Sequence, residues 1–320
     1  MARICVLGGS GFIGRHLCER LSQQGHTLVV PSRRRERAKH LITLPTVDVV
    51  DANVHEESTL RRLLQGMDAV INLIGVLHSP RGKPYGSTFA QVHVELPRKV
   101  VAACLANKVP RLLHMSALKA APDAPSAYLR SKADGEAVVV QARGQLATTI
   151  FRPSVVFGME DRFLNTFAHL LAKLPFMTLA CPKAQFQPVY VGDVAQAMAT
   201  SVEAEESFGR AYDLVGPKVY SLHELVAFAG EHSGHRRPIL DLDDRMSYLL
   251  ARLMEFAPGK PLTADQYYSM RVASTSAAPL PFDIDPTPLE TVAPVYLKGV
   301  YPRSRYSLFR YYAGRKGREV

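Results

Sequence analysis

Residues 3–14 read RICVLGGSGFIG and join a short apolar run directly to a glycine-rich turn. Gly8, Gly11 and Gly14 have the spacing GxxGxxG, and apolar residues follow them at helical spacing. The first glycine allows a tight turn, the second lets backbone approach a pyrophosphate, and the third lets a helix pack on the sheet. The stretch predicts a strand, a phosphate-binding loop and a helix whose N-terminus attracts an anion. The alternative is a turn of the same shape that binds no ligand.

Outward from this stretch, strand-like and helical runs alternate as far as residue 158. The later apolar runs that we expect to be strands lie at 27–31, 47–54, 68–74, 111–117 and 148–158. The helical runs between them include 15–24, 58–65 with Ser58 as N-cap, 88–106 and 127–142. Strands that alternate with helices indicate parallel βαβ units. The sequence therefore predicts an α/β fold with a Rossmann-type, doubly wound parallel sheet.

The pattern changes after residue 158, and we expect three parts in the chain. Residues 1–158 form a dinucleotide-binding Rossmann domain, and residues 159–297 form a smaller mixed α/β substrate lobe that partly rejoins it at about 186–216. Residues 273–294 are rich in Pro, Ser, Thr and Ala and predict a loop. Residues 298–320 form a basic tail with interleaved aromatic residues.

Composition excludes several classes of protein. Hydrophobic residues make up 47% and charged residues 21%, values ordinary for a globular protein and unlike a disordered one. No run approaches the ~18 apolar residues of a membrane span. The start shows no charged leader with a cleavage site, so we do not expect secretion. The four cysteines show no CxxC spacing, so we expect neither zinc nor disulfides, and a cytoplasmic location fits.

Positive charge is unevenly distributed along the chain. The net charge is +10, and residues 1–150 carry 20 Lys and Arg against 11 Asp and Glu. Residues 298–320 carry 7 basic residues and 1 acidic residue. Because no zinc finger, RNA-recognition box or helix-turn-helix is present, we do not expect nucleic acid as a partner. A phosphate-rich cofactor and an anionic membrane surface fit this charge better.

The end of the second strand indicates which dinucleotide binds. An acidic residue there would hold the 2′-hydroxyl of NAD, whereas residues 31–39 read PSRRRERAK. Ser32, Arg33 and Arg34 stand where an adenosine 2′-phosphate would lie, and the arginine fork suits a phosphate. The sequence favours NADP(H) over NAD(H). The alternative is the solvated basic start of a helix, since the arginines here cannot all point inward.

Several motifs, in the right order over residues 4–200, resemble the extended or atypical short-chain dehydrogenase/reductases, which are NAD-dependent epimerase/dehydratase-like proteins. They are GGSGFIG at 8–14, Asn53-Val54 after the third strand, Asn72 to Gly75, the YxxxK motif from Tyr128 to Lys132, Arg152-Pro153-Ser154 with Gly158, and VYVGDVA at 189–195. The resemblance implies cofactor contacts from Gly8, Ser10, Gly11, Phe12, Ile13, Gly14, Ser32, Arg33, Arg34, Asn53, Val54, Leu73, Ile74, Gly75, Tyr128, Lys132 and Pro153.

The resemblance also implies a catalytic group. Tyr128 would exchange a proton beside the nicotinamide, and Lys132, one helical turn later, would lower the phenol pKa and hold the ribose. The family has Ser or Thr where this chain has Ala117, and Ser116 substitutes only if the loop shifts by one residue. Losing such a hydrogen-bond donor costs about 100-fold in rate. His93 stands where the family often has Asn, and we expect a packed core histidine.

Within the family, the sequence resembles the subgroup of the 39-kDa accessory subunit of respiratory complex I, on the segments 116–139 and 287–299. This implies a complex I-associated subunit or assembly factor with a structural nucleotide. The alternative is an active oxidoreductase or epimerase/dehydratase on a small, isoprenoid-like or quinone-like substrate, which the Tyr128 and Lys132 pair favours. A redox-sensing regulator is a third reading, disfavoured by that pair.

Two further segments bear on partners. The tail 298–320 suits docking on complex I or on an anionic membrane surface, peripherally at its inner face, although a disordered basic end fits equally. The apolar stripe over 246–254 predicts a core helix face, or else a pocket wall for a lipid or quinone. Asp241, Asp243 and Asp244 predict a solvated loop and no metal site.

Overall fold

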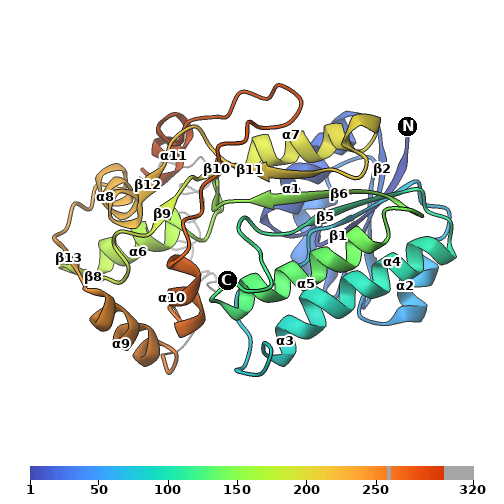
Figure 1. Cartoon of the computed structure of the whole chain (residues 1–320). Helices are drawn as coiled ribbons and strands as arrows, with labels where there is room; N and C mark the ends of the chain where they lie inside the picture. The colour runs from blue at the N-terminus through green and yellow to red at the C-terminus, as the bar shows by residue number, and fades with distance from the viewer. Residues whose placement is uncertain (258–260, 299–320) are drawn as a thin grey trace.

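A seven-stranded parallel sheet lies at the centre of the larger domain (Figure 1). The computed structural model describes residues 1–257 and 261–298, so the tail beyond Lys298 lies outside the described residues. The strands of the sheet are β1 (Arg3–Leu7), β2 (Thr27–Ser32), β3 (Val47–Asp51), β4 (Ala69–Asn72), β5 (Arg111–Met115), β6 (Ala147–Pro153) and β11 (Ala211–Leu214). Their order is β11-β6-β5-β4-β1-β2-β3, and every neighbouring pair is parallel. The predicted doubly wound α/β fold is confirmed.

Helices cover both faces of this sheet (Figure 1). α1 (Phe12–Gln23) and α7 (Val191–Ser201) pack together on one face. The other face carries α2 (Glu57–Leu63), α4 (Leu96–Ala106) and α5 (Ala127–Gln141). Alternate residues of β1 serve the two cores, since Ile4 and Val6 join one buried cluster and Cys5 and Leu7 join the other. A strand buried on both faces reads as a continuous apolar run, which is why RICVL has no polar alternation.

The remaining elements of the larger domain are short. A single helical stretch leads into α4, made of α3 (Ser87–Phe89) and a π-helical segment (Ala90–Glu95). Two 3₁₀ segments follow β2 and α7, at Arg35–Leu41 and Glu205–Ser207.

The second lobe is built from short strand pairs and five helices within the described residues. Its strands are β7 (Val156–Phe157) with β10 (Val189–Tyr190), β8 (Met177–Leu179) with β13 (Ile239–Asp241), and β9 (Gln185–Phe186) with β12 (Tyr220–Ser221). Its helices are α6 (Leu164–Lys173), α8 (Leu222–His232), α9 (Asp244–Met254), α10 (Ala264–Met270) and α11 (Leu289–Leu297). A third buried cluster, which includes Phe157, Leu171 and Leu225, forms its core. The chain then leaves this lobe to add β11 at the edge of the main sheet.

Three local expectations were wrong. Ser58 does not cap α2, because the helix starts at Glu57 and Glu56 is the N-cap. The predicted loop at 273–294 ends early, since α11 begins at Leu289 and accommodates Pro294.

The stripe on α9 is largely not core, and this is the third correction. Met246, Leu249 and Leu253 are each about half exposed, at 48%, 50% and 57%. The small residues Ser247 and Ala251 face inward instead and are fully buried, which brings α9 close to its neighbours. None of the helices in residues 1–257 and 261–298 is long and apolar enough to cross a membrane.

Candidate functional site

The glycine loop has the geometry that a phosphate-binding turn requires. Gly8 has φ +84°, a left-handed conformation that favours glycine. A Cβ on Gly14 would lie 2.4 Å from the carbonyl oxygen of Gly8, so the helix and the turn touch only because this side chain is absent. Gly11 is the N-cap of α1 and makes no side-chain cap, which leaves first-turn N–H groups of the helix for a ligand. The loop therefore fits an anionic pyrophosphate.

The loop opens onto the point where the strand order reverses. β1 lies between β4 on one side and β2 on the other. A Cβ on Gly8 would lie 3.3 Å from the backbone of Leu73 and Ile74, so the turns after β1 and β4 are in contact. Leu73 and Ile74 are half-buried and Gly75 is exposed. In open α/β sheets this switch point, at the carboxyl ends of the strands, is the usual place for a ligand.

The carboxyl end of β2 is basic and open. Ser32 is buried, and its Oγ donates to the Arg34 carbonyl at 3.0 Å. Arg33 and Arg34 are exposed. Burial and the nearby charges of Arg33 and Lys99 lower the pKa of His55, which places cationic groups around the start of α2. The arrangement offers exposed guanidinium groups to a phosphate.

Asn53 and Val54 follow β3 near the same end. Val54 is buried, whereas Asn53 is exposed. The Asn53 side-chain amide donates to Glu56 at 2.9 Å, and its oxygen accepts from the His55 N–H at 3.2 Å. The side chain of Asn53 is thus engaged in the turn that starts α2.

Tyr128 and Lys132 lie one turn apart on α5, whose N-cap Ser126 accepts a hydrogen bond from the Leu129 N–H at 3.2 Å. Lys132 is only 4% exposed, and its Nζ donates to the Met115 carbonyl at 2.6 Å. Burial lowers the pKa of Lys132 to about 8. Burial also raises the pKa of Tyr128 to about 12, so the phenol is protonated near neutral pH.

His93 links the turn after β4 to α5. Its Nε2 lies 3.1 Å from the Val76 N–H and accepts from it, and its Nδ1 lies 2.8 Å from Ser131 Oγ. Because Ser131 Oγ donates to the Tyr128 carbonyl, the His93 proton belongs on Nδ1. Burial, reinforced by the charge of Lys132, lowers the pKa of His93 to about 3. A neutral imidazole therefore packs against Tyr128, with ring centroids 5.6 Å apart.

A second buried histidine, His114, lies on β5. His114 is 3% exposed, and its Nδ1 lies 3.3 Å from the Asn72 side-chain amide. Burial, followed by the charge of Lys132, lowers the pKa of His114 well below its usual value. The predicted site thus contains one buried lysine, Lys132, and two neutral imidazoles, those of His93 and His114.

The loop after β5 carries the position at which the family resemblance implies a third catalytic residue. Ser116 is 3% exposed, and its buried Oγ has no hydrogen-bond partner among residues 1–257 and 261–298. An unpaired buried hydroxyl costs about 1–3 kcal/mol, so a ligand that bonded it would be stabilised. Ala117 belongs to the apolar cluster against which Tyr128 packs. This neighbour of the tyrosine has no hydroxyl.

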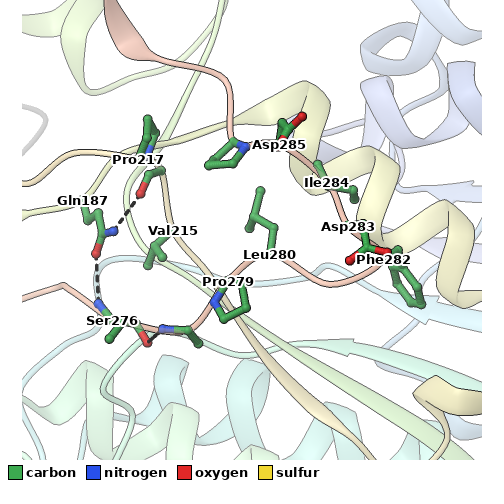
Figure 2. Close-up of a pocket in the computed structure, with 14 residues that line it drawn as sticks. Gln187, Val215, Pro217, Ser276, Pro279, Leu280, Phe282, Asp283, Ile284 and Asp285 are labelled. Carbon is green, nitrogen blue, oxygen red and sulfur yellow. Dashed lines mark hydrogen bonds between the residues drawn. The ribbon is translucent and has the colours of Figure 1, made fainter.

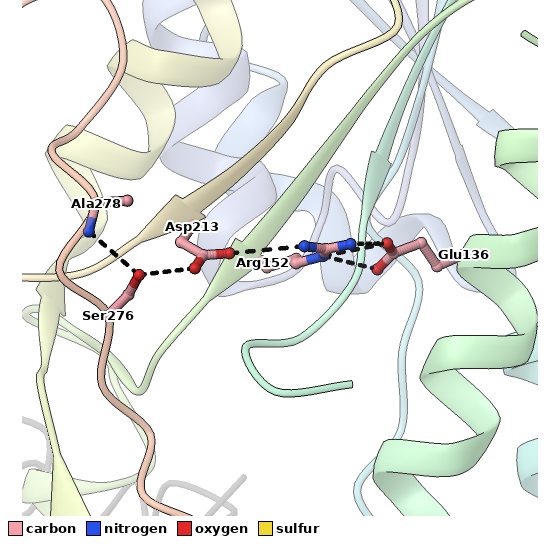
Figure 3. Close-up of polar contacts among 5 residues, drawn as sticks. All are labelled: Glu136, Arg152, Asp213, Ser276 and Ala278. Atoms are coloured by element: carbon pink, nitrogen blue, oxygen red, sulfur yellow. Dashed lines mark hydrogen bonds and ion pairs between the residues drawn. The ribbon is translucent and has the colours of Figure 1, made fainter. Parts of the chain in front are cut away.

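A charged network ties α5 to the edge of the sheet (Figure 3). Arg152 Nε on β6 donates to both carboxylate oxygens of Glu136, at 3.1 and 3.0 Å. Arg152 Nη1 lies 3.9 Å from Asp213 on β11. Asp213 in turn accepts from Ser276 Oγ at 2.7 Å. Pro153, at the end of β6, follows directly from this network and is half-buried.

A cavity of about 530 Å³ lies beside the Ser276 end of this network (Figure 2). It is lined by Gln187, by Val215 to Pro217, and by residues 276–280 and 282–286. None of the predicted cofactor or catalytic residues lines it. Residues 1–257 and 261–298 contain no group of three His, Cys, Asp or Glu able to hold a metal ion.

The predicted residues follow the carboxyl ends of neighbouring parallel strands. The glycine loop follows β1, Leu73 to Gly75 follow β4, Ser116 follows β5 and Pro153 ends β6. His93 is a packed core histidine, as expected from the sequence, although its hydrogen bonds to Val76 and Ser131 were not predicted. Sequence reasoning missed Asp265, which bonds the start of α5, because nothing in the sequence signals a contact between positions 137 residues apart.

Asp193, in the motif at 189–195, bonds a segment far along the chain. It lies within the first turn of α7, where Tyr190 is the N-cap. Its carboxylate accepts from the Thr287 N–H at 2.7 Å and from Thr287 Oγ1 at 2.8 Å. It therefore holds the segment that precedes α11.

Comparison with known proteins agrees with this geometry. The model of the NAD dependent epimerase/dehydratase family matches residues 4–214. A mitochondrial NADH dehydrogenase (ubiquinone) 1 alpha subcomplex subunit 9 from Rattus norvegicus is 30% identical, over 96% of this chain and 81% of its own length. The subunit of the same name from Arabidopsis thaliana is 33% identical over 69% of this chain and 55% of its own length.

The fold has solved counterparts. A UDP-glucuronic acid 4-epimerase from Bacillus cereus, in complex with UDP-glucuronic acid and NAD, superposes with a TM-score of 0.68 at 18% identity. The match covers 93% of this chain and 100% of the epimerase chain. At this identity the likeness concerns the fold. The family match and the relative that is 30% identical over nearly the whole chain identify it: the chain belongs to the NAD dependent epimerase/dehydratase family.

Proposed function

We propose that this protein is a dinucleotide-binding accessory subunit or assembly factor of respiratory complex I, in which the nucleotide serves structure more than turnover. The support for complex I is the relative that is 30% identical over 96% of the chain and carries the name of a subunit of that enzyme. The support for a structural nucleotide is one observation in the crevice. A complete phosphate loop and a buried Lys132 accompany a Tyr128 whose neighbour is Ala117.

The residues of the crevice divide the work of holding the dinucleotide. The glycine loop, from Gly8 to Gly14, receives the pyrophosphate at the N-terminus of α1. Lys132 holds the nicotinamide ribose through its ammonium, and Ser116 Oγ gains a partner that it lacks in this structure. When bound, the cofactor supplies a site for hydride transfer. Tyr128 holds a proton at its phenol oxygen, since its pKa is raised to about 12.

We also propose that NADP(H) binds in preference to NAD(H). The exposed guanidinium groups of Arg33 and Arg34 stand beside Ser32, where an acidic residue would select the free ribose hydroxyl. Arginine forks bind phosphate oxygens in pairs, and NAD(H) offers none at this position. Nucleotide released from the purified protein by acid and alkali, then identified by mass spectrometry, tests both proposals. Recovery of no dinucleotide would contradict the first, and NAD(H) alone would contradict the second.

The assignment to complex I has its own test. Deletion of the gene in its source cell should lower the amount of assembled complex I, and the wild-type chain should restore it. A Tyr128→Phe chain should restore assembly equally well, because the proposed role does not use proton transfer. Full assembly without the protein would contradict the role.

We propose that residues 298–320 dock the protein on an anionic membrane surface. The structure describes only Lys298 of this segment. The basic and aromatic composition fits an anionic surface, each cation near it contributing about 1 kcal/mol. We place the protein peripherally on the inner face of the membrane, on the cytoplasmic side in a bacterial cell. Sedimentation with anionic vesicles at low salt should be lost on deletion of 299–320. Equal sedimentation of both forms would remove the tail as the anchor.

The second candidate function is an active oxidoreductase or epimerase/dehydratase. The observation that favours it is the shared helix face of Tyr128 and Lys132, with the pKa of the lysine lowered to about 8. Assays of the nucleotide-loaded protein with aldehydes, quinones and sugar nucleotides test it. Turnover that disappears in Tyr128→Phe, with nucleotide affinity unchanged, would establish it over the structural role.

A further inference from the structure

One segment of the second lobe crosses the predicted site. We call residues 263–276, which comprise α10 and the extended chain after it, the strap. It begins at Thr263, the N-cap of α10, and ends at the bond between Ser276 and Asp213. In Figure 1, α10 lies between the second lobe and α5. The strap is therefore the part of the second lobe closest to the helix that carries Tyr128 and Lys132.

The first contact of the strap is with the start of α5. Asp265 Oδ1 accepts from the Ala127 N–H at 2.6 Å, and its Oδ2 accepts from the Tyr128 N–H at 3.0 Å. First-turn N–H groups have no partner within their own helix, and a carboxylate there is also favoured by the helix dipole. Ser126 binds only the Leu129 N–H. Two of the first-turn donors of α5 are thus satisfied by the other lobe.

The second contact lies beside the tyrosine. Val272, two residues after α10 ends, packs against the apolar cluster of Ala117 and Leu129, and Tyr128 packs against the same cluster. Within its own domain Tyr128 contacts Phe89 and His93, with ring centroids 6.0 and 5.6 Å away. Both lobes therefore contribute to the surroundings of the ring, which is half-buried.

The third contact is with the chain after β6 and with β11. Ser154 Oγ lies 2.9 Å from both the carbonyl and the Oγ of Ser274, just after Pro153. Ser276 bonds Asp213, and the network continues through Arg152 to Glu136, one turn beyond Lys132 (Figure 3). The strap thus bonds the start of α5 directly and is linked to the middle of α5 through Asp213 and Arg152.

We propose that the strap is a closure built into the chain: it shields Tyr128 from an incoming substrate and slows release of the bound dinucleotide. The inference rests on the proposed nucleotide binding and adds a cause for its retention. A carbonyl compound that approached the phenol would have to displace Val272. The bonds of Asp265 and Ser276 hold the strap against α5 and β11, and release of a dinucleotide held by Lys132 is slowed for as long as these bonds persist.

The test is the rate at which loaded protein releases NADPH into an excess of unlabelled competitor. Asp265→Asn and Ser276→Ala should each speed release by about 5-fold or more, the effect of losing about 1 kcal/mol of hydrogen bonding. Asp285→Asn, an exposed carboxylate later in the same chain segment, is the matched control and should release at the wild-type rate. Tight NADPH binding with equal rates in all four proteins overturns the strap and leaves the proposed function intact. Failure of the wild-type chain to bind any dinucleotide overturns both.

A second measurement does not depend on nucleotide. A thiol reagent should modify Tyr128→Cys slowly, because Val272 covers that position, and the wild-type chain gives the background from its own four cysteines. Adding Asp265→Asn should accelerate the modification by at least about 5-fold. Rates that are equal with and without Asp265, in variants that retain the wild-type melting temperature, would show that the strap does not cover the tyrosine.

Discussion

The two ends of the predicted site differ in the burial and hydrogen bonding of their charged groups. At the β2 end, Arg33 and Arg34 are exposed and their charges face solvent. At the β5 end, Lys132, His93 and His114 are almost fully buried, and each is held by specific hydrogen bonds. Exposed charges are screened by salt and exchange partners easily, whereas buried groups cost free energy unless they are bonded or neutral. In the proposed complex with a dinucleotide, selectivity therefore lies at the open end, and positioning at the closed end.

The largest effect is expected where the two ends join, at the glycine loop. Gly14→Ala places a methyl group 2.4 Å from the Gly8 carbonyl oxygen, which forces the backbone apart. We expect a loss of about 3 kcal/mol in unfolding free energy and no measurable dinucleotide binding. Chemical denaturation and nucleotide titration measure the two. Gly144→Ala is the control, since a Cβ there meets nothing within 4 Å. A stable Gly14→Ala protein that binds dinucleotide would contradict the role of the loop.

The next effect tests whether the closed end carries a free-energy cost. The pKa of Lys132 falls from 10.5 to about 8 on folding, so the folded state resists protonation. The penalty is complete below pH 8 and disappears above pH 10.5, and it amounts to roughly 3 kcal/mol at pH 7. A variant that removes the lysine escapes this penalty, but it also loses the hydrogen bond to the Met115 carbonyl, which costs about 1 kcal/mol.

Lys132→Met should therefore stabilise the unliganded protein at pH 7 by about 2 kcal/mol, with the gain vanishing at high pH. Urea unfolding at several pH values measures it. The same variant should bind dinucleotide more weakly, because its ammonium is lost. Lys183→Met, at an exposed position, serves as the control and should change neither quantity. A destabilised Lys132→Met protein at pH 7 would contradict the cost assigned to the buried lysine.

A smaller effect sharpens the open end. Arg33→Asp with Arg34→Ser should lower NADPH affinity by roughly tenfold, from the loss of a charge-assisted phosphate contact, and leave NADH affinity nearly unchanged. Fluorescence titration of both nucleotides provides the ratio. The effect should shrink at 1 M salt, where the Debye length is about 3 Å. Equal losses of affinity for NADPH and NADH would show that the 2′-phosphate does not contact Arg33 and Arg34.

The smallest effect concerns His93 and changes sign with pH. The pKa of His93 falls from 6.5 to about 3 on folding, so wild-type stability declines as pH drops below 6.5. His93→Phe should cost about 1 kcal/mol at pH 7.5, through lost bonds to Val76 and Ser131. At pH 5 it should instead be more stable than wild type by about 1 kcal/mol. Thermal unfolding across this range should show the two curves crossing. Parallel curves would mean that the pKa of His93 does not change on folding.

The sequence allowed the open end of the site to be predicted better than the closed end. Glycine spacing and the apolar run of β1 are local, so they predict the turn and the parallel sheet without tertiary information. The YxxxK motif placed Tyr128 and Lys132 on one helix for the same reason. The roles assigned to the individual site residues remain predictions.

What could not be predicted depends on contacts between distant segments. Asp265 reaches Tyr128 across 137 residues, and no local pattern marks it. The exposed face of α9 was misread because an amphipathic stripe does not say whether anything covers it. Ser58 was misread because the turn formed by Asn53 and Glu56 starts α2 one residue earlier.

The place of β11 has a consequence for how the chain assembles during synthesis. This strand closes the sheet beside β6, yet it emerges from the ribosome after α6, α7 and several strands of the second lobe. Until then β6 is an unpaired edge, and the buried cluster that Phe151 of β6 shares with Leu214 of β11 is incomplete. A nascent chain that stops near residue 158 therefore exposes a template for strand addition. The two lobes are completed together, by a strand that belongs to one and is delivered by the other.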